Sequence, residues 1–364
     1  MKMNRKAVVL ISGGIDSTLA VKVIQEQGIE LQGLNFKGLF HCCRDDAART
    51  SAELGVPITV FSETEEYLQL IEAPKYGWGH GANPCTDCRI YMFRIARNFM
   101  EQVGASFLIS GEVLGQRPNS QRRDHFRAIE RDTGLEGLLV RPLSAKLLPP
   151  TRPELEGILD REKLLAIQGR SRKPQMELAA HYGVTDIPTP STGCLLTEDA
   201  VANRIRDILA RGDHLDMWMA ETVKFGRHFR VTEDAKAIVG RNETENLRLE
   251  DLYARAKESD RVATLLLPDD FTGPSALIIG EATVDVIETV GGMMLRYGKE
   301  GSGGARTILL KAGGEERPVS VTYALDDAAL DALRIPAHHL KGAYRPPKPP
   351  RIRKGNGTAY ETRA

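Results

Sequence analysis

The sequence predicts a doubly wound α/β domain built on a parallel sheet, followed by a smaller α+β domain. Strand-length apolar runs alternate with helical patterns over the first 110 residues, and a glycine turn follows the first of these runs directly. After about residue 211 the pattern becomes richer in strands. Alternating strands and helices pair into a parallel sheet that helices cover on both faces.

The predicted strands of the first domain are short apolar runs, as expected of strands buried on both faces. They are Ala7 to Ile11, Leu31 to Phe36, Ile58 to Phe61 and Ser106 to Ser110. The helices between them end at Gly28 and Gly55, and a further helix opens at Asn83, with Asn as its cap and Pro84 in first position. Residues 151–182 have a helical pattern, and a turn-rich connector leads to a helix near Glu198.

Composition restricts the class of protein. The 364 residues carry 49 basic and 49 acidic side chains, so nucleic-acid binding must come from local patches and not from a global field. The apolar run behind the basic start is too short for a signal peptide, and no stretch approaches the roughly 20 apolar residues of a membrane helix. We therefore expect a cytoplasmic protein with no membrane contact and with reduced thiols.

We predict three parts along the chain: a first domain over residues 1–211, an α+β module over 212–335, and a tail over 336–364. Strands of the module are expected at His228 to Val231, Lys236 to Val239, Ala263 to Leu267, Ser275 to Ile279 and Thr307 to Lys311. Its helices are expected at Asn242 to Lys257 and Glu281 to Tyr297. The tail is basic, rich in proline and glycine and poor in apolar residues, which is typical of disorder.

A phosphate-binding loop follows the first strand. Its two glycines allow a tight turn and leave the backbone N–H groups open to an anion, and its serine and threonine lie at a helix N-terminus that favours negative charge. Asp16 can hold Mg²⁺ or orient the leaving pyrophosphate. The lysine of a Walker loop is absent, which favours cleavage between the α- and β-phosphates of ATP. The predicted ligands of ATP in this loop are Ser12, Gly13, Gly14, Asp16, Ser17 and Thr18.

This loop resembles that of the PP-loop ATP pyrophosphatases, which include tRNA thiolation enzymes, asparagine synthetase and GMP synthetase. The resemblance implies the adenine nucleotide α-hydrolase-like fold, with ATP and Mg²⁺ as cofactors. It also implies that ATP is cleaved to AMP and pyrophosphate through an adenylated substrate oxygen. By the same resemblance, the second strand lies beside the adenine at Asn35.

A second loop, Ser110 to Gln116, resembles the Gly-Glu-x-Leu-Gly-Gln segment of the tRNA 4-thiouridine synthetases. The Ser-Gln pair that follows it in those enzymes is Ser120-Gln121 here, and Leu139 to Leu143 matches their next strand and turn. The resemblance spans about residues 5–210 and assigns Gly111 and Gln116 to the nucleotide site. The RNA-binding and rhodanese domains of those synthetases have no counterpart here, so other surfaces are expected to bind RNA.

An arginine cluster near this second loop has two readings. It is either a patch that tracks RNA phosphates or the solvated face of a helix. The cluster comprises Arg117, Arg122, Arg123, Arg127 and Arg131.

Three cysteines have the spacing of sulfur chemistry. Cys85 and Cys88 share one face of a helix's first turn, where the helix N-terminus favours the thiolate, and Cys194 lies far along the chain. Thiolation enzymes with such thiols hold a 4Fe–4S cluster or use a catalytic persulfide and a transient disulfide. The run Ser191 to Cys194 resembles the second-cysteine motif of the 2-thiouridine synthetases.

We favour the cluster, with these three thiols as its ligands, because the lack of a fourth protein ligand argues against structural zinc. Buried structural cysteines are the other reading. The adjacent Cys42 and Cys43 are interpreted as incidental.

The function predicted from these features is an ATP-dependent tRNA sulfurtransferase. Its catalytic residues are Asp16, Cys85, Cys88 and Cys194, and its partners are tRNA and a sulfur donor, either a cysteine desulfurase or sulfide. The segment Arg296 to Lys299 and the glycines after it resemble the NFACT RNA-binding module of ribosome quality-control and fibronectin-binding proteins. The alternatives are a PP-loop enzyme that activates a carboxylate for amide formation and a non-catalytic, ATP-responsive RNA-binding protein.

Overall fold

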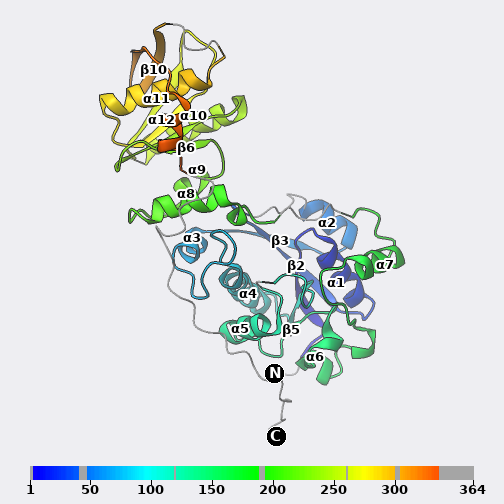
Figure 1. Ribbon diagram of the computed structural model, residues 1–364. Coiled ribbons are helices and arrows are strands. Elements are labelled where there is room, and N and C mark those ends of the chain that lie inside the picture. The colour runs from blue at the N-terminus through cyan, green and yellow to red at the C-terminus, as the bar shows by residue number, and fades with distance from the viewer. Residues whose placement is uncertain are drawn as a thin grey trace. The chain divides into compact units, whose positions relative to one another are not determined.

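The computed structural model describes residues 3–40, 47–118, 120–187, 193–259, 261–299 and 304–335. These residues form two compact units that divide between Thr197 and Glu198, and each unit has its own sheet (Figure 1). The predicted fold class, a parallel α/β sheet followed by a smaller α+β domain, is confirmed. The tail and the Cys42–Cys43 pair lie outside the described residues.

The first unit has a five-stranded sheet in the order β3-β2-β1-β4-β5, and every neighbouring pair is parallel. The strands are β1 (Lys6–Leu10), β2 (Glu30–Lys37), β3 (Ile58–Ser62), β4 (Phe107–Ser110) and β5 (Leu139–Val140). The chain winds one way from β1 to β3 and the other way from β4 to β5. The strand order therefore reverses between β1 and β4, where α/β sheets open a crevice at their carboxyl ends.

Helices cover both faces of this sheet because alternate residues of β1 point to opposite sides. Ala7 and Val9 pack under α1 (Ile15–Gln25), and Val8 and Leu10 pack under α4 (Cys85–Gln102). The helices α2 (Ala47–Leu54) and α7 (Lys173–His181) join α1, and α5 (Arg123–Thr133) joins α4 (Figure 1). Two shorter helices of the unit are α3 (Glu65–Glu72) and α6 (Arg152–Leu155).

The second unit has a six-stranded antiparallel sheet in the order β11-β10-β8-β9-β7-β6. Its strands are β6 (Arg227–Arg230), β7 (Ala235–Val239), β8 (Ala263–Pro268), β9 (Ala276–Gly280), β10 (Arg306–Ala312) and β11 (Glu315–Val321). The core lies under α11 (Val284–Tyr297), while α10 (Glu243–Glu258) packs on β8 and β9. The remaining helices are α8 (Asp199–Leu209), α9 (Met217–Thr222) and α12 (Asp327–Leu333).

The division at Thr197 differs from the predicted boundary after Arg211, because α8 is tied to the second unit. Arg204 on α8 donates to the carbonyl oxygens of Val223 and Gly226, at 2.7 and 2.8 Å. Sequence periodicity shows that a helix exists here but not which core its apolar face joins.

Two local expectations for the first unit are wrong. The helix predicted to be capped by Asn83 begins at Cys85 with Pro84 as its cap, because the Asn83 side chain accepts from Cys85 Sγ at 3.0 Å instead of from a first-turn N–H. Residues 151–182 are helical only in α6, in α7 and in one 3₁₀ turn. Over the described residues, no helix is long and apolar enough to cross a membrane.

Candidate active site

The phosphate loop leaves β1 and turns into α1 at the point where the strand order reverses. Gly13 has φ +72°, and a side chain there would point into open space. Gly14 is the N-cap and has no side chain to accept from the first-turn N–H groups, which stay available to an anion. The Ser17 hydroxyl donates to the Gly14 carbonyl at 2.8 Å and accepts from the Ser12 amide at 3.3 Å, so it holds the loop in shape.

Asp16 lies between this loop and the second loop. Its Oδ2 accepts from Gln116 Nε2 at 3.0 Å, whereas its Oδ1 is buried with no hydrogen-bond partner among the described residues. A Cβ atom on Gly111 would lie 2.6 Å from the Ser17 amide nitrogen, so only glycine lets the two loops approach this closely. Three residues predicted from two separate motifs therefore meet at one point of the sheet edge.

Arg117 comes directly after Gln116 in the sequence, and its guanidinium lies near the Cys85 thiol. Its side chain reaches solvent, yet enough protein surrounds it that burial lowers its pKa, and the neighbouring charge of Arg89 lowers it further. The groups that oppose this shift are Cys85, Asp16 and Glu112. Asp16 of the phosphate loop and Cys85 are thus both within electrostatic reach of one guanidinium, and we use the name Arg117 recess for the group formed by Arg117, Asp16, Cys85, Arg89 and Glu112.

A buried ion network that sequence reasoning missed includes two of the charges that act on Arg117, those of Glu112 and Arg89. Glu112 is 3% exposed and accepts from Arg141 Nε at 3.0 Å, and it lies 3.5 Å from Arg89 Nε. Arg141 also pairs with Glu130 on α5 and stacks on the Phe126 ring at 3.7 Å. The second-loop motif contains Glu112, but its two partners, Arg89 and Arg141, come from two other segments, and only the tertiary fold identifies them.

The start of α4 places its two cysteines in different surroundings. Asp87, which lies between them, accepts from the backbone N–H groups of Lys75 and Tyr76 at 3.0 Å each. These bonds fix the loop that precedes the helix. Cys85 Sγ turns toward Asn83 and the Arg117 recess, while Cys88 is buried and its Sγ lies 3.9 Å from Met92 Sδ.

The distant Cys194 is brought to the Cys88 side of α4. The segment that carries it docks through Leu195, whose N–H donates to the Phe40 carbonyl at 3.0 Å, and through Leu196, whose carbonyl accepts from the Ala82 N–H at 2.8 Å. Both Cys88 and Cys194 lie within electrostatic reach of the Tyr67 hydroxyl. Tyr67 gives no signal in the sequence, where it resembles an ordinary core tyrosine of an amphipathic helix.

The three thiols do not converge on one point. Among the described residues, no three histidine, cysteine or acidic side chains are gathered as metal ligands. The observed contacts of Cys85 with Asn83 and of Cys88 with Tyr67 differ from the shared geometry of a cluster site. No step proposed below runs through an iron–sulfur cluster.

The other sequence-predicted residues take distinct places. Asn35 is buried and its side-chain amide donates to the Ile11 carbonyl at 2.7 Å, so it braces β2 against the end of β1. The arginine cluster is dispersed: Arg117 faces the recess, Arg122 lies 3.5 Å from Asp124, and Arg131 pairs with Asp132 at 2.9 Å.

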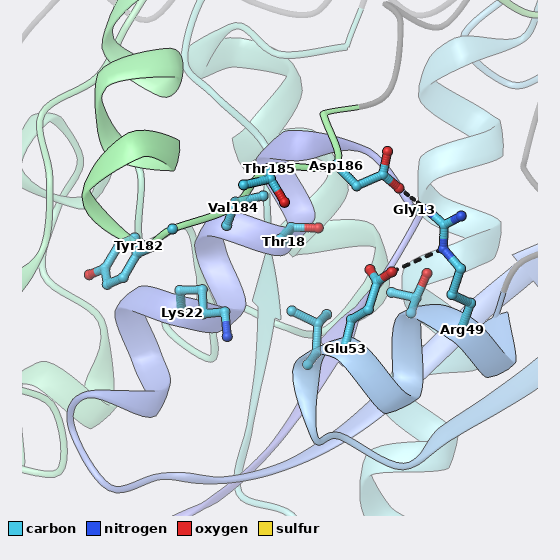
Figure 2. A pocket seen from close by; sticks show the side chains of 12 residues that line it. Gly13, Thr18, Lys22, Arg49, Glu53, Tyr182, Val184, Thr185 and Asp186 are labelled. Atoms are coloured by element: carbon cyan, nitrogen blue, oxygen red, sulfur yellow. Dashed lines mark ion pairs between the residues drawn. The ribbon is translucent and has the colours of Figure 1, made fainter.

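A pocket of about 310 Å³ borders the phosphate loop between α1, α2 and the segment after α7 (Figure 2). Arg49 on α2 pairs with Glu53 one turn along the same helix, at 3.0 Å, and with Asp186 of the segment after α7, so its charge is neutralised. The lining residues nearest the phosphate loop are Gly13, Thr18 and Lys22. Thr18 therefore faces this pocket and not the Arg117 recess.

Comparison with known families supports both resemblances. Residues 5–131 match the family described as tRNA methyl transferase HUP domain, and residues 226–331 match the NFACT protein RNA binding domain. A predicted tRNA methyltransferase subunit from Methanocaldococcus jannaschii is a structural neighbour with 16% identity and a TM-score of 0.35, over 58% of this chain and 90% of that one.

Curated relatives match the first unit. The tRNA-specific 2-thiouridylase MnmA of Acidithiobacillus ferrooxidans is 33% identical over 118 residues, which cover 30% of this chain and 34% of the relative. The same enzyme from Synechocystis sp. is 30% identical over 163 residues, covering 41% and 45%. This chain thus matches less than half the length of each of these relatives. Residues 5–131 thus match a tRNA methyl transferase HUP domain and are similar to part of the tRNA 2-thiouridylases, and residues 226–331 match an NFACT RNA binding domain.

Proposed function

We propose that this protein is an ATP-dependent tRNA sulfurtransferase, which adenylates a uridine carbonyl oxygen and replaces that oxygen with sulfur. The observation that carries the proposal is the Arg117 recess, where Asp16 of the phosphate loop and the Cys85 thiol lie around one guanidinium. An enzyme that activates a carboxylate has no need of a thiol at this position. The relatives named tRNA-specific 2-thiouridylase support the same chemistry.

The residues at the phosphate loop suit ATP and Mg²⁺. The open backbone of Gly13 and Gly14 can receive phosphate oxygens. The buried Oδ1 of Asp16, which has no hydrogen-bond partner in the described part of the chain, is an oxygen of the kind that Mg²⁺ prefers. When bound, ATP supplies the adenylyl group and Mg²⁺ neutralises phosphate charge. Gln116 holds the other Asp16 oxygen and so fixes the carboxylate.

The recess suits the second half of the reaction. After the uridine oxygen has displaced pyrophosphate from the α-phosphorus, a sulfur nucleophile adds to the ring carbon. The C–O bond then breaks, and AMP leaves with the electron pair. Arg117, with Arg89 beside it, would bind the AMP phosphate and so favour its departure. Cys85 lies within electrostatic reach of Arg117. Where the donor is a cysteine desulfurase, one of the three thiols would carry its sulfur as a persulfide. Once the outer sulfur has bonded to the ring carbon, a second thiol would attack the inner sulfur and form a disulfide, which a thiol reductant reopens.

The second unit offers a surface for RNA. The Arg227 guanidinium stacks 4.2 Å from the Tyr297 ring, and Arg334 donates to the Tyr297 hydroxyl at 2.9 Å. Burial lowers the pKa of Arg227, and the nearby charges of Arg241 and Arg334 add to this effect. Arginines on an aromatic platform bind phosphates and stack on bases, so we assign RNA contact to this arginine–tyrosine surface.

Replacing both Arg227 and Arg334 with glutamine is expected to weaken binding of an unmodified tRNA transcript about tenfold at low salt. The slope of log affinity against log salt should flatten by about 1.5, since two phosphate contacts are lost. Filter binding at several salt concentrations measures both quantities. Arg255→Gln is the matched control, because Arg255 lies outside the arginine–tyrosine surface and is held by two acids, Glu221 and Asp251; an equal loss in the control would contradict the assignment.

The full chain tests the proposed function directly. It is incubated with unmodified tRNA, ATP, Mg²⁺ and sulfide, and AMP and thionucleosides are measured by mass spectrometry. We expect RNA-dependent AMP release together with a thiolated uridine. AMP released only with a carboxylate acceptor and ammonia would show amide chemistry instead, and the absence of AMP under every condition would show a non-catalytic protein. Iron and acid-labile sulfide measured on anaerobically purified protein test the cluster prediction separately.

A further inference from the structure

The loop that precedes α4, residues 74–83, is fastened to the start of that helix. The Asp87 carboxylate in the first turn of α4 accepts from two consecutive backbone N–H groups of the loop, at 3.0 Å each. At the end of the loop, Asn83 Oδ1 accepts from Cys85 Sγ at 3.0 Å, and the Asn83 carbonyl accepts from the Gly79 N–H at 2.8 Å. The 74–83 loop therefore moves as one piece with the thiol-bearing turn of α4.

The same loop also holds the segment that carries Cys194. The Ala82 N–H donates to the Leu196 carbonyl at 2.8 Å, and His80 Nδ1 donates to the Thr197 carbonyl at 2.9 Å. The Cys194 carbonyl accepts from the Thr197 N–H at 2.9 Å and from the Thr197 hydroxyl at 2.6 Å. Cys194 is thus tied to the 3₁₀ turn that the loop holds.

Gly81 allows the loop and this turn to approach each other. Its φ is +69°, in the left-handed region that favours glycine. A Cβ atom on Gly81 would overlap the Leu196 carbonyl oxygen and would lie 3.1 Å from Thr197 Cα. Both of these neighbours are backbone atoms, so neither can turn aside as a flexible side chain would. A larger residue here must push the Cys194 segment away from the loop.

The position of Cys194 relative to α4 depends on this contact. On its other side the turn is held by the Leu195 N–H, which donates to the carbonyl of the buried Phe40 at 3.0 Å. That bond joins the turn to the segment after β2, whereas the 74–83 loop joins it to α4. Cys194 and the α4 thiols are far apart in the chain, so tertiary contacts must supply a proximity that the chain does not.

We propose that the 74–83 loop, through Gly81, is a positioning element that holds Cys194 beside the thiols of α4. The inference rests on the proposed sulfurtransferase function, in which a second thiol attacks the inner sulfur of a persulfide. In that step the new S–S bond forms, the sulfur on the ring leaves with the electron pair of the old S–S bond, and the thiol proton passes to the thionucleoside. The attack requires two thiols held within reach of each other.

The test compares Gly81→Ala with Gly104→Ala in the full chain. Gly104 follows the other end of α4 with φ +68°, and a Cβ atom there would meet no atom of the described residues within 4 Å. Alanine at Gly104 therefore imposes the same backbone strain without the overlap. Reduced protein is treated with the thiol oxidant diamide, and disulfide-linked peptides that join Cys194 to α4 are quantified over time by mass spectrometry.

Wild-type protein should form this disulfide, and Gly81→Ala should form it at least about tenfold more slowly, because displaced thiols meet less often. Gly104→Ala should match the wild-type rate. His80→Ala, which removes one hydrogen bond of an exposed side chain, should slow the reaction about two- to fivefold. In the thiolation assay with a cysteine desulfurase as donor, Gly81→Ala should lower the thionucleosides formed per AMP released, which general damage to the fold would not do.

Hydrogen exchange shows whether Gly81→Ala keeps its fold. The amides of β1 and α1 should retain wild-type protection, while the peptide that contains Leu195 and Thr197 should exchange faster. If the protection of β1 and α1 is lost, His80→Ala decides. No Cys194–α4 disulfide in the wild type, a wild-type rate in both Gly81→Ala and His80→Ala, or equal slowing in Gly104→Ala would overturn the inference. Disulfide formation needs no turnover, so failure of the thiolation assay and failure of this test are separate results.

Discussion

Asp16→Ala is expected to reduce ATP-dependent AMP release at least about 10³-fold, a loss of roughly 4 kcal/mol of transition-state stabilisation. The Asp16 carboxylate offers one oxygen to Gln116 and leaves the other buried without a partner among the described residues. Alanine removes both the oxygen available to Mg²⁺ and the contact that joins the two loops. Release of AMP and pyrophosphate in single-turnover reactions measures the effect.

The fold should survive this change, because a carboxylate in the first turn of a helix contributes only about 0.3–1 kcal/mol. Asp16→Asn removes the negative charge but keeps an oxygen that can accept from Gln116. If AMP release is lost in both Asp16→Ala and Asp16→Asn, the negative charge of Asp16 is what the reaction needs. Asp285→Ala alters a first-turn carboxylate of α11 in the other unit and should leave activity unchanged. AMP release at the wild-type rate in Asp16→Ala would refute the assigned role.

Asp207→Ala is expected to destabilise the second unit by about 3–5 kcal/mol. Asp207 on α8 is 8% exposed and binds Arg230 through both oxygens, at 2.7 and 3.2 Å. It also lies 3.5 Å from the ammonium of Lys236, which is 2% exposed. Removing the carboxylate leaves the buried Lys236 ammonium and the half-buried Arg230 guanidinium without a compensating negative charge.

Lys236→Met is the informative partner variant. It removes the cation with the longer contact and leaves the Arg230–Asp207 pair intact, so stability should be unchanged or higher. Burial lowers the pKa of Lys236 from 10.5 to about 8. Between these values the unfolded chain binds more protons than the folded one, so wild-type stability should rise by about 3 kcal/mol from pH 8 to 10.5. Lys236→Met should lack this rise.

Urea unfolding of the full chain measures both variants. The protein has two tryptophans, Trp78 in the first unit and Trp218 in the second. In a Trp78→Phe background, the fluorescence of Trp218 reports the unfolding of the second unit alone. The indole N–H of Trp218 donates to the Leu252 carbonyl at 3.0 Å, so the ring is held in the folded unit. A loss below 1 kcal/mol for Asp207→Ala would show that water reaches the two cations and that their burial is overstated.

Local sequence patterns were sufficient for much of this protein. The phosphate loop, Ser12 to Thr18, was predictable because its glycines, its acid and the strand and helix around it are consecutive in the chain. The four apolar runs of the first unit became strands β1 to β4 at nearly their predicted positions. Of the second unit, α9, β11 and α12 went unpredicted: β11 is mostly exposed and has few apolar residues to mark it.

The proximity of the two loops was also predictable. The phosphate loop follows β1 and the second loop follows β4, and these parallel strands end at the same edge of the sheet. The hydrogen bond between Asp16 and Gln116 shows that the two motifs lie in contact. What could not be predicted is which side chains turn toward that site. Cys85 and Cys88 belong to one motif, yet their contacts differ, with Asn83 and the Arg117 recess for one and Tyr67 for the other.

The sequence by itself thus determined the fold class, the phosphate loop and the three thiols, because each is encoded in residues that are neighbours in the chain. Only the tertiary structure decided that Tyr67 contacts Cys88 near Cys194, and that Asp207 ties α8 to the second unit. Those relations join segments far apart in sequence. They depend on how the helices pack and on which buried charges form ion pairs. Neither the packing nor the pairing can be predicted from the local periodicity of the sequence.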